Sequence, residues 1–415
     1  MRPVTSVTIM GAANGWTLIC QVVILITLAR TAPIETVGSY GLVLALLQPL
    51  YMLSLAGLRS NLAADAKHEI DLNTALALRL SLAALFGVVC LNGIWFWRPA
   101  LLPIALPLIF LKAVEMIGDL AFGAAQRDGR IGAVARGWML RGAVSLGAFA
   151  LGLALSGSTT TALWAQASGV GCCVIFHDLR QAANSQFPRP CWRLDDLLGL
   201  FRATLPLGLS QWLVAAQMAL PRLTLDALLG AAAVAVFMPV AYLERAAVTG
   251  TNAADLALGW RLARLWSADN RLEFYKILGW MMVLTGGAGG AILIGIAWYG
   301  ESIVRFSFGS EYAETSAVLI WVTPAIILRI CANVLQSGLI AQRRFGALGW
   351  VKAGLFAISI PVIWWSVSVN GLTGIGQALS GLALLRLLSL GSLMVLRSGY
   401  QKETMPLPKA AQSRG

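Results

Sequence analysis

The sequence has few charged residues for its length. Asp, Glu, Lys and Arg make up 12% of its 415 residues, 58% of the residues are hydrophobic, and the mean hydropathy is +0.74. A soluble domain carries about 25% charged residues. With so few, a chain of this length cannot cover a water-exposed surface with polar groups. The composition therefore excludes a soluble globular protein and predicts one that lies in lipid.

Histidine and the common catalytic motifs are also scarce. The chain has only His68 and His177, so a His-rich zinc site and a His-x-x-Glu-His helix are excluded, and it contains neither G-x-S-x-G nor a P-loop. The six cysteines fall mostly in apolar runs and include no C-x-x-C pair, so no disulfide framework or zinc site is expected. No polar stretch is long enough for an ATP-binding domain. We therefore expect no enzyme activity, no metal and no cofactor.

Long apolar runs dominate what is present. Each is roughly 18 to 25 residues long, the length that a helix needs to cross about 30 Å of hydrocarbon. The first run ends at Arg30 without a small-residue cleavage site, so we interpret it as a membrane helix and not as a cleaved signal. The sequence predicts an all-α polytopic membrane protein with about twelve transmembrane helices, at residues 5–29, 37–57, 74–96, 101–122, 137–156, 160–178, 200–221, 231–256, 276–298, 315–339, 348–368 and 371–396.

The cations are distributed unevenly between the two sides of the predicted membrane. Most of the 31 Lys and Arg residues lie near the termini or the loops after even-numbered runs, whereas the opposite loops hold only Arg30, Arg98, Arg222 and Arg305. The positive-inside rule makes the rich side cytoplasmic and places both termini there. Because the cations alternate between loops, the formal charge of +12 does not indicate nucleic-acid binding. We expect a multi-pass protein of a bacterial inner membrane, surrounded by membrane lipids.

A weak internal repeat predicts two similar halves. Residues 125–127 (Ala-Gln-Arg) follow the fourth run and reappear as residues 341–343 after the tenth, while residues 37–40 have a loose counterpart at 234–237. A repeat after six helices returns the chain to the same side, which predicts two parallel-related six-helix bundles around a central cavity. The expected segments are an N-terminal bundle, a cytoplasmic linker, a C-terminal bundle and a disordered cytoplasmic tail, at residues 1–180, 181–199, 200–397 and 398–415.

Several charged residues fall inside apolar runs. A charge at the bilayer centre costs roughly 2.5–3.5 kcal/mol, so we expect the cations to face a bundle interior or a water-filled cavity and to attract a phosphate-bearing substrate. The four cations are Lys112, Arg245, Arg329 and Arg386. Three acidic residues in the same runs are candidates for exchanging protons or sodium ions, namely Glu115, Asp119 and Glu244.

A structural role is the alternative for each of these charges. Lys112, Glu115 and Asp119 follow one another at i, i+3 and i+7, which places them on one helix face, so Lys112 can pair with Glu115. Arg329 or Arg386 can pair with Asp119 or Glu244, or extend to the cytoplasmic interface. Neighbours such as Glu244 and Arg245 point about 100° apart on a helix and are not natural partners.

A set of local patterns, spread over most of the chain, points to a known family. The patterns are 28–30 (Leu-Ala-Arg), 35–41 (Glu-Thr-Val-Gly-Ser-Tyr-Gly), 56–59 (Ala-Gly-Leu-Arg), 221–223 (Pro-Arg-Leu), 228–232 (Leu-Leu-Gly-Ala-Ala), 261–266 (Arg-Leu-Ala-Arg-Leu-Trp) and 308–313 (Phe-Gly-Ser-Glu-Tyr-Ala). In their order and their places relative to the helices, the sequence resembles the polysaccharide flippases of the multidrug/oligosaccharidyl-lipid/polysaccharide exporter superfamily.

This resemblance implies two six-helix bundles that form a V around a cationic cavity. It also implies an undecaprenyl-diphosphate-linked oligosaccharide as the substrate, flipped from the cytoplasmic to the outer leaflet by alternating access. Other polysaccharide-assembly membrane proteins are the implied partners. The family has no short catalytic motif to transfer, so the site residues above rest on the intramembrane charges alone.

Three other functions fit the sequence less well. A cation-coupled drug or small-solute exporter of the same superfamily would call for a more hydrophobic cavity with one or two acids, and four intramembrane cations argue against it. A major-facilitator carrier has its charged loop motif after the second helix, whereas residues 127–130 (Arg-Asp-Gly-Arg) follow the fourth. A membrane glycosyltransferase or polymerase commonly has a large outer loop, and the longest one predicted here is the short stretch at 298–314. The flippase is the prediction.

Overall fold

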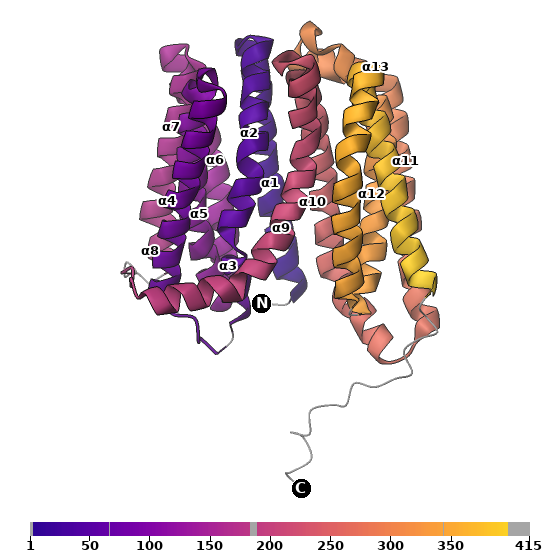
Figure 1. Ribbon diagram of the computed structural model, residues 1–415. Helices are drawn as coiled ribbons and strands as arrows, with labels where there is room; N and C mark the ends of the chain where they lie inside the picture. The colour runs from indigo at the N-terminus through magenta and orange to yellow at the C-terminus, as the bar shows by residue number, and fades with distance from the viewer. Residues whose placement is uncertain (1–2, 66, 183–188, 343, 397–415) are drawn as a thin grey trace.

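The computed structural model describes residues 3–65, 67–182, 189–342 and 344–396, and Figure 1 shows two groups of helices standing side by side. The described residues form helices and no strands, so the all-α prediction is confirmed. The helices of the first group are α1 (Pro3–Thr31), α2 (Ile34–Leu55), α3 (Leu58–Ala64), α4 (Leu72–Trp97), α5 (Leu102–Arg127), α6 (Ile131–Ser156), α7 (Thr159–Cys173) and α8 (Leu179–Ala182). The predicted tail at 398–415 and part of the predicted linker lie outside the described residues.

The first helix of the second group also packs against helices of the first group. The helices of the second group are α9 (Leu194–Leu229), α10 (Ala231–Ser267), α11 (Arg271–Phe308), α12 (Glu314–Ala341) and α13 (Phe345–Leu396). Short connecting elements are the 3₁₀ turns η1 (Pro99–Leu101) and η3 (Ser310–Tyr312) and the π-helix η2 (Val174–Asp178). Ten described stretches are long and apolar enough to cross a membrane. Two of the predicted runs lie within α13, which breaks at Gly371, where φ is 58°, a value that favours glycine.

The helices run between two ends of the molecule, which we name by the termini. The terminal end is where α1 begins and α13 finishes, and the distal end is opposite (Figure 1). At the terminal end α2 stops because Ala56 and Gly57 are both left-handed, with φ of 49° and 62°. The chain then forms α3, whose Leu58 and Leu62 pack with Phe201 of α9. The first turns of α9 thus lie beneath the first bundle before the helix joins the second.

The seventh predicted run is longer in the structure than in the prediction. We expected a break near Pro221, but α9 continues to Leu229. The polar residues that suggested a loop are accommodated by tertiary contacts. Asp226 is 3% exposed and accepts hydrogen bonds of 2.8 and 3.0 Å from Nη1 of Arg98, which follows α4 in the first bundle. Because the Asp226 carboxylate is paired with Arg98 of the other bundle, α9 can remain helical at this point.

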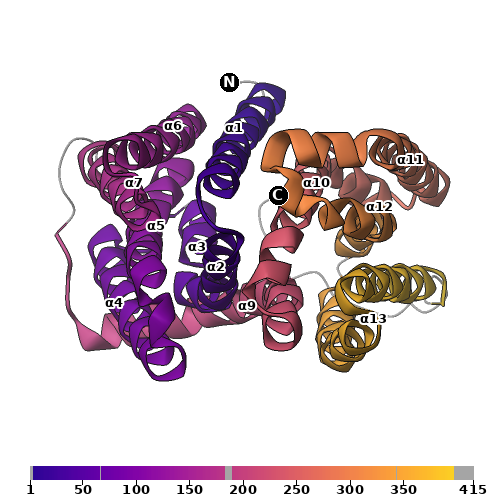
Figure 2. The ribbon, with the colours of Figure 1, turned by 90° about the horizontal axis from the view of Figure 1, so that it is seen from above.

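The two bundles contact each other at the distal end. A Cβ atom on Gly38 of α2 would lie 1.8 Å from the backbone oxygen of Ala231, so this approach of α2 to α10 requires glycine. Arg30, near the end of α1, donates to the backbone oxygens of Phe306 and Ser307 in α11. Figure 2, which views the molecule from above, shows α2 and α9 in the middle, between the two groups. The distal end is therefore held together by glycine packing and arginine side chains.

Candidate functional site

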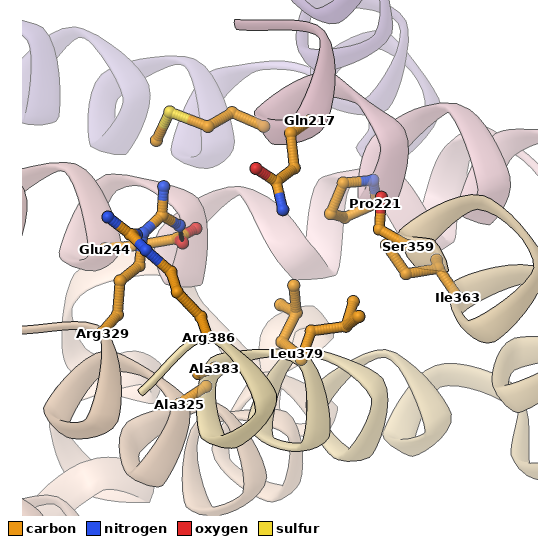
Figure 3. A pocket seen from close by; sticks show the side chains of 12 residues that line it. Gln217, Pro221, Glu244, Ala325, Arg329, Ser359, Ile363, Leu379, Ala383 and Arg386 are labelled. Carbon is orange, nitrogen blue, oxygen red and sulfur yellow. Dashed lines mark hydrogen bonds and ion pairs between the residues drawn. The ribbon is translucent and has the colours of Figure 1, made fainter. Parts of the chain in front are cut away.

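A polar pocket lies within the second bundle, and Figure 3 shows the side chains that line it. These residues come from the middle parts of their helices. The pocket is a cavity of about 50 Å³ between α9, α10, α12 and α13, and we call it the second-bundle pocket. Its lining consists of Gln217, Met218, Pro221, Glu244, Ala325, Arg329, Ser359, Ile363, Leu379, Leu382, Ala383 and Arg386. Three residues predicted from the sequence, Glu244, Arg329 and Arg386, therefore meet in one place although they come from three helices.

Glu244 and Arg329 form an ion pair in this pocket. The Nη1 atom of Arg329 on α12 donates to Oε1 of Glu244 on α10, and the two side chains are 21% and 13% exposed. The structural alternative for these two residues, pairing, is therefore present. Pairing lowers the cost of placing each charge in a membrane interior. It also leaves the Glu244 carboxylate unable to neutralise a second cation fully.

Arg386 supplies that second cation. Its Nη2 atom donates to the amide oxygens of Asn333 and Gln336 at 2.8 and 3.1 Å, and within the described part of the chain it forms no ion pair. With two guanidinium groups and one carboxylate in its lining, the second-bundle pocket has a net charge of about +1.

A second polar pocket lies within the first bundle, between α1, α5, α6 and α7. This first-bundle pocket has a volume of about 140 Å³. Its lining consists of Asn14, Thr17, Cys20, Gln21, Glu115, Trp138, Arg141, Gly142, Ser145 and Val170. Amides, hydroxyls and an indole ring make up much of this surface, and both of its charged residues have partners of opposite charge.

The charges of the first-bundle pocket are paired. Lys112 Nζ lies 2.7 Å from Oε2 of Glu115, and the ammonium also lies 5.1 Å from the centre of the Tyr51 ring. Arg141 Nε lies 2.6 Å from Oδ2 of Asp178, whose side chain is 1% exposed. Lys112 and Glu115 therefore show the structural arrangement that the sequence left open.

Asp178 ends a π-helical turn that brings three possible metal ligands together. The side chains of Cys173, His177 and Asp178 place one ligand atom each within 4.8 Å of one another. His177 Nδ1 lies 2.8 Å from Oδ1 of Asp178, while the Arg141 guanidinium binds the other carboxylate oxygen. A metal ion would have to compete with this cation for the carboxylate, so the residues do not favour a metal site.

Asp119, predicted as an ion-coupling residue, lies away from both pocket linings. Arg59 Nη1 lies 3.1 Å from Asp119 Oδ1, and Arg79 Nη2 lies 3.7 Å from Oδ2. Arg79 is completely buried, and the Arg59 guanidinium also stands 5.0 Å from the Trp138 ring. These contacts join α3, α4, α5 and α6 near the terminal end. Asp119 therefore holds these helices together, which is a structural role.

Arg245, the last predicted cation, is not among the lining residues of either pocket. Its neighbour Glu244 lines the second-bundle pocket, whereas Arg245 is within electrostatic range of Arg222 and of Tyr40. Tyr40 of α2 is 6% exposed and lies close to Tyr242 of α10, where the two bundles meet. Arg245 is therefore near the contact between the bundles and outside the lining of the second-bundle pocket.

Sequence reasoning missed the roles of three arginines. Arg79 and Arg141 belong to the cation-rich side of the sequence and Arg222 is expected in an outer loop, but all three lie within helices and Arg79 is fully buried. The sequence could have indicated Arg79 and Arg141, because both fall inside predicted apolar runs. Partners such as Asp119 and Asp178 come from other helices, so their pairing could not be read from spacing.

The two pockets occupy equivalent places in the repeat. The first-bundle pocket uses the first, fourth, fifth and sixth long helices of its half, α1, α5, α6 and α7. The second-bundle pocket uses the corresponding α9, α12 and both halves of α13, together with α10. Residues 37–40 and 234–237, which suggested the repeat, also lie at matching places near the starts of α2 and α10.

Comparison with known proteins agrees with this architecture. No protein-family model matches the chain. A capsular polysaccharide biosynthesis protein, CapF, from Staphylococcus aureus is 21% identical over 345 residues, which cover 81% of this chain and 85% of CapF. Uncharacterized proteins of Mycobacterium tuberculosis are 33% identical over 87 residues, or 20% of either chain.

Solved structures show the same fold. An inward-facing multidrug resistance MATE family transporter of the MOP superfamily aligns with a TM-score of 0.75 and 12% identity, covering 91% of this chain and 94% of its own. The lipid II flippase MurJ in an inward closed conformation aligns with a TM-score of 0.72 and 10% identity, covering 93% and 87%. The chain is therefore a multi-pass membrane protein with the all-α fold of these transporters.

Proposed function

We propose that the protein is a flippase that moves an undecaprenyl-diphosphate-linked oligosaccharide from the cytoplasmic to the outer leaflet by alternating access. The observation that carries the proposal is the excess positive charge of the second-bundle pocket. Arg386 stands beside the Arg329–Glu244 pair in the middle of a membrane fold, and among the described residues its partners are the amides of Asn333 and Gln336. Such a cation is costly in lipid unless an anion joins it, and a diphosphate is a strong acceptor for guanidinium donors.

The diphosphate and sugars of such a lipid cannot cross hydrocarbon unaided, because each unsatisfied polar group costs several kcal/mol there. Polar pockets at mid-depth would hold these groups while the prenyl chain stays in lipid. The distal contacts at Gly38 and Arg30 fit a state in which the bundles are closed at one end. The positive-inside pattern would make the terminal end cytoplasmic, so this state would receive substrate from the cytoplasmic leaflet. The likeness to CapF supports a role in polysaccharide assembly.

The decisive experiment measures where the lipid-linked oligosaccharide lies. Inverted membrane vesicles from a deletion strain are treated with a sugar-oxidising reagent that cannot cross the bilayer, and the modified fraction is determined. We expect the glycolipid to accumulate on the cytoplasmic face without the protein and to be cleared when the protein is restored. Each lost charge-assisted hydrogen bond is worth about 1.5–3 kcal/mol, so an Arg329→Gln, Arg386→Gln variant should clear it at least about tenfold more slowly.

The matched control is Arg264→Gln, which removes an exposed cation from the terminal end of α10. It should restore clearance to the level of the unaltered protein. If deletion leaves the sidedness of the glycolipid unchanged, the flippase proposal is wrong. Normal clearance by the double variant would instead show that the second-bundle pocket does not hold the diphosphate.

A cation-coupled exporter of small solutes is the second candidate. The observation in its favour is Glu244, an acid inside the pocket of a chain with a MATE-like fold. A cationic drug would meet Arg329 and Arg386 in the same space, which disfavours its binding. Efflux of a fluorescent cation such as ethidium from cells that express the protein distinguishes the two functions, since only the exporter should lower its accumulation.

A further inference from the structure

We infer that the first-bundle pocket is a sugar-binding subsite, so that the two bundles divide one substrate: the second binds the diphosphate and the first binds the uncharged glycan attached to it. This inference rests on the proposed flippase function and goes beyond it by assigning a carbohydrate site to residues of α1, α5, α6 and α7. Of the residues that line this pocket, only Glu115 was singled out from the sequence, and there as a candidate for ion coupling and not for substrate binding.

The charge balance of the pocket is the first argument. Glu115 and Arg141 are the charged residues of its lining, and each is already bound to an opposite charge, Lys112 and Asp178 respectively. The pocket therefore has no excess cation to attract a phosphate and no unpaired acid to attract a cationic drug. A neutral ligand that both donates and accepts hydrogen bonds suits it better.

The chemistry of the other lining residues is the second argument. Asn14 and Gln21 of α1 carry amides, and Thr17 and Ser145 carry hydroxyls, groups that donate and accept hydrogen bonds as sugar hydroxyls require. Trp138, whose ring has the Arg59 guanidinium 5.0 Å from its centre, adds an aromatic surface of the kind on which the apolar face of a sugar ring can lie. This combination contrasts with the second-bundle pocket, where guanidinium groups dominate the polar lining.

Unused hydrogen-bonding atoms are the third argument. Oε1 of Gln21 and Nη2 of Arg141 are buried, and within the described residues neither has a hydrogen-bond partner. Just behind the lining, Gln166 is 5% exposed and donates to Ser145 Oγ at 2.8 Å, while its own Oε1 has no partner among the described residues. Buried polar atoms are normally satisfied by protein, water or ligand. A cavity of about 140 Å³ lies against them and can hold such a group.

The position of the pocket fits a ligand that extends from the other bundle. Tyr40 of α2, which lies close to Tyr242 of α10 where the bundles meet, is within electrostatic range of Glu115 in the first-bundle pocket and of Arg245. A glycan attached to a diphosphate at Arg329 and Arg386 would pass between the bundles to reach Asn14 and Gln21. Substrate binding would then join the two bundles through one ligand.

The test compares two ligands on the purified full-length protein in lipid nanodiscs. One probe is undecaprenyl diphosphate without sugar, and the other is the glycolipid that accumulates in the deletion strain. Binding is followed by native mass spectrometry. We expect the glycolipid to bind about tenfold more tightly than the bare diphosphate, as a few additional net hydrogen bonds would give. An Asn14→Leu, Gln21→Leu variant should lose this advantage and still bind the bare diphosphate normally, which also shows that it is folded.

Arg386→Gln is the matched comparison, and it should weaken both probes by the same factor. The sugar-subsite inference is overturned if the Asn14→Leu, Gln21→Leu variant keeps the full preference for glycolipid, or if it weakens both probes equally. A retained preference would mean that the pocket holds only water. If the unaltered protein binds neither probe, or if no glycolipid accumulates on deletion, the proposed flippase function itself fails.

Discussion

The two pockets lie at equivalent places in the two bundles, yet they treat charge differently. In the first bundle each charged lining residue has a partner of opposite sign, as Arg141 has in Asp178. In the second, Arg386 has only the amides of Asn333 and Gln336 among the described residues. A shared architecture thus fixes where a polar cavity can form, and the partner of each charge decides what the cavity attracts. The following experiments test this difference, beginning with the largest expected effect.

Replacing one arginine in each pocket should separate stability from function. Arg141→Gln leaves the buried Asp178 carboxylate without its guanidinium, which should cost about 3–5 kcal/mol of stability. Arg386→Gln gives up hydrogen bonds to two amides but also removes a cation from the membrane interior, so it should cost less stability than Arg141→Gln while it greatly slows transport. Thermal unfolding in detergent and the vesicle assay give the two readouts.

Asp178→Asn provides the check on this interpretation. Combined with Arg141→Gln, it removes the uncompensated charge and should recover much of the lost stability. Equal destabilisation by Arg141→Gln and Arg386→Gln would contradict the proposed difference between the two pockets, in which Arg141 is bound to a carboxylate and Arg386 to amides.

The contact between bundles should be sensitive to a single methyl group. Gly38→Ala places a Cβ atom 1.8 Å from the Ala231 backbone oxygen, so α2 and α10 must separate, at a cost of about 1–3 kcal/mol. Spin labels at the distal ends of α4 and α11 should report a longer distance. Gly93→Ala is the control, because its Cβ would have no atom within 4 Å. An unchanged distance in Gly38→Ala would show that this contact does not hold the bundles together.

The Lys112–Glu115 pair should couple more weakly than Arg141 and Asp178. Its side chains are 15% and 26% exposed and lie one turn apart on the same helix. A double-mutant cycle with Lys112→Met and Glu115→Gln, read by thermal unfolding, should give a coupling of about 0.5–3 kcal/mol. A coupling of zero would mean that the two charges are balanced by other groups, and that Glu115 is available for ion coupling.

The smallest effect is expected in the loops at the terminal end. Hydrogen bonds from the backbone N–H groups of Ile70 and then Glu69, with Arg127 nearby, hold the pKa of Asp65 below its usual value. A lowered folded-state pKa stabilises the fold above the unfolded-state pKa, and this stabilisation is lost as the pH falls through the folded-state pKa. Asp65→Asn should therefore lower the melting temperature slightly at neutral pH and make no difference in strong acid.

The corresponding loop of the second bundle supplies the comparison. Asp269 follows α10 as Asp65 follows α2 and α3, but its side chain is 81% exposed. Asp269→Asn should change the melting temperature less than Asp65→Asn does. An equal change, or one that does not depend on pH, would contradict the role of the backbone hydrogen bonds to Asp65.

Much of the fold could be predicted because the membrane imposes it. Each apolar run has to satisfy its own backbone in lipid, so run length alone locates the helices, down to the break between the last two at Gly371. The prediction failed near Pro221, where charges suggested a loop. The structure keeps the helix because Arg98, far away in the sequence, binds Asp226.

The candidate site was only partly predictable for the same reason. Residues such as Arg329 and Arg386 stand out because charge is expensive in an apolar run. Their partners do not, since Glu244 and Asn333 are brought to them by other helices. The first-bundle pocket depends on amides and hydroxyls, which carry no charge and therefore stand out less from an apolar run than Arg329 or Arg386 does.

The sequence by itself determined that this chain is a helical membrane protein, where its helices lie and which charges need an explanation, because the energies of burying backbone and charge in lipid act on each residue locally. Only the tertiary structure decided which charges are neutralised and which remain to meet a ligand. That outcome depends on contacts of a few ångströms between helices far apart in the chain, as when Asp178 reaches Arg141 and no described carboxylate pairs with Arg386.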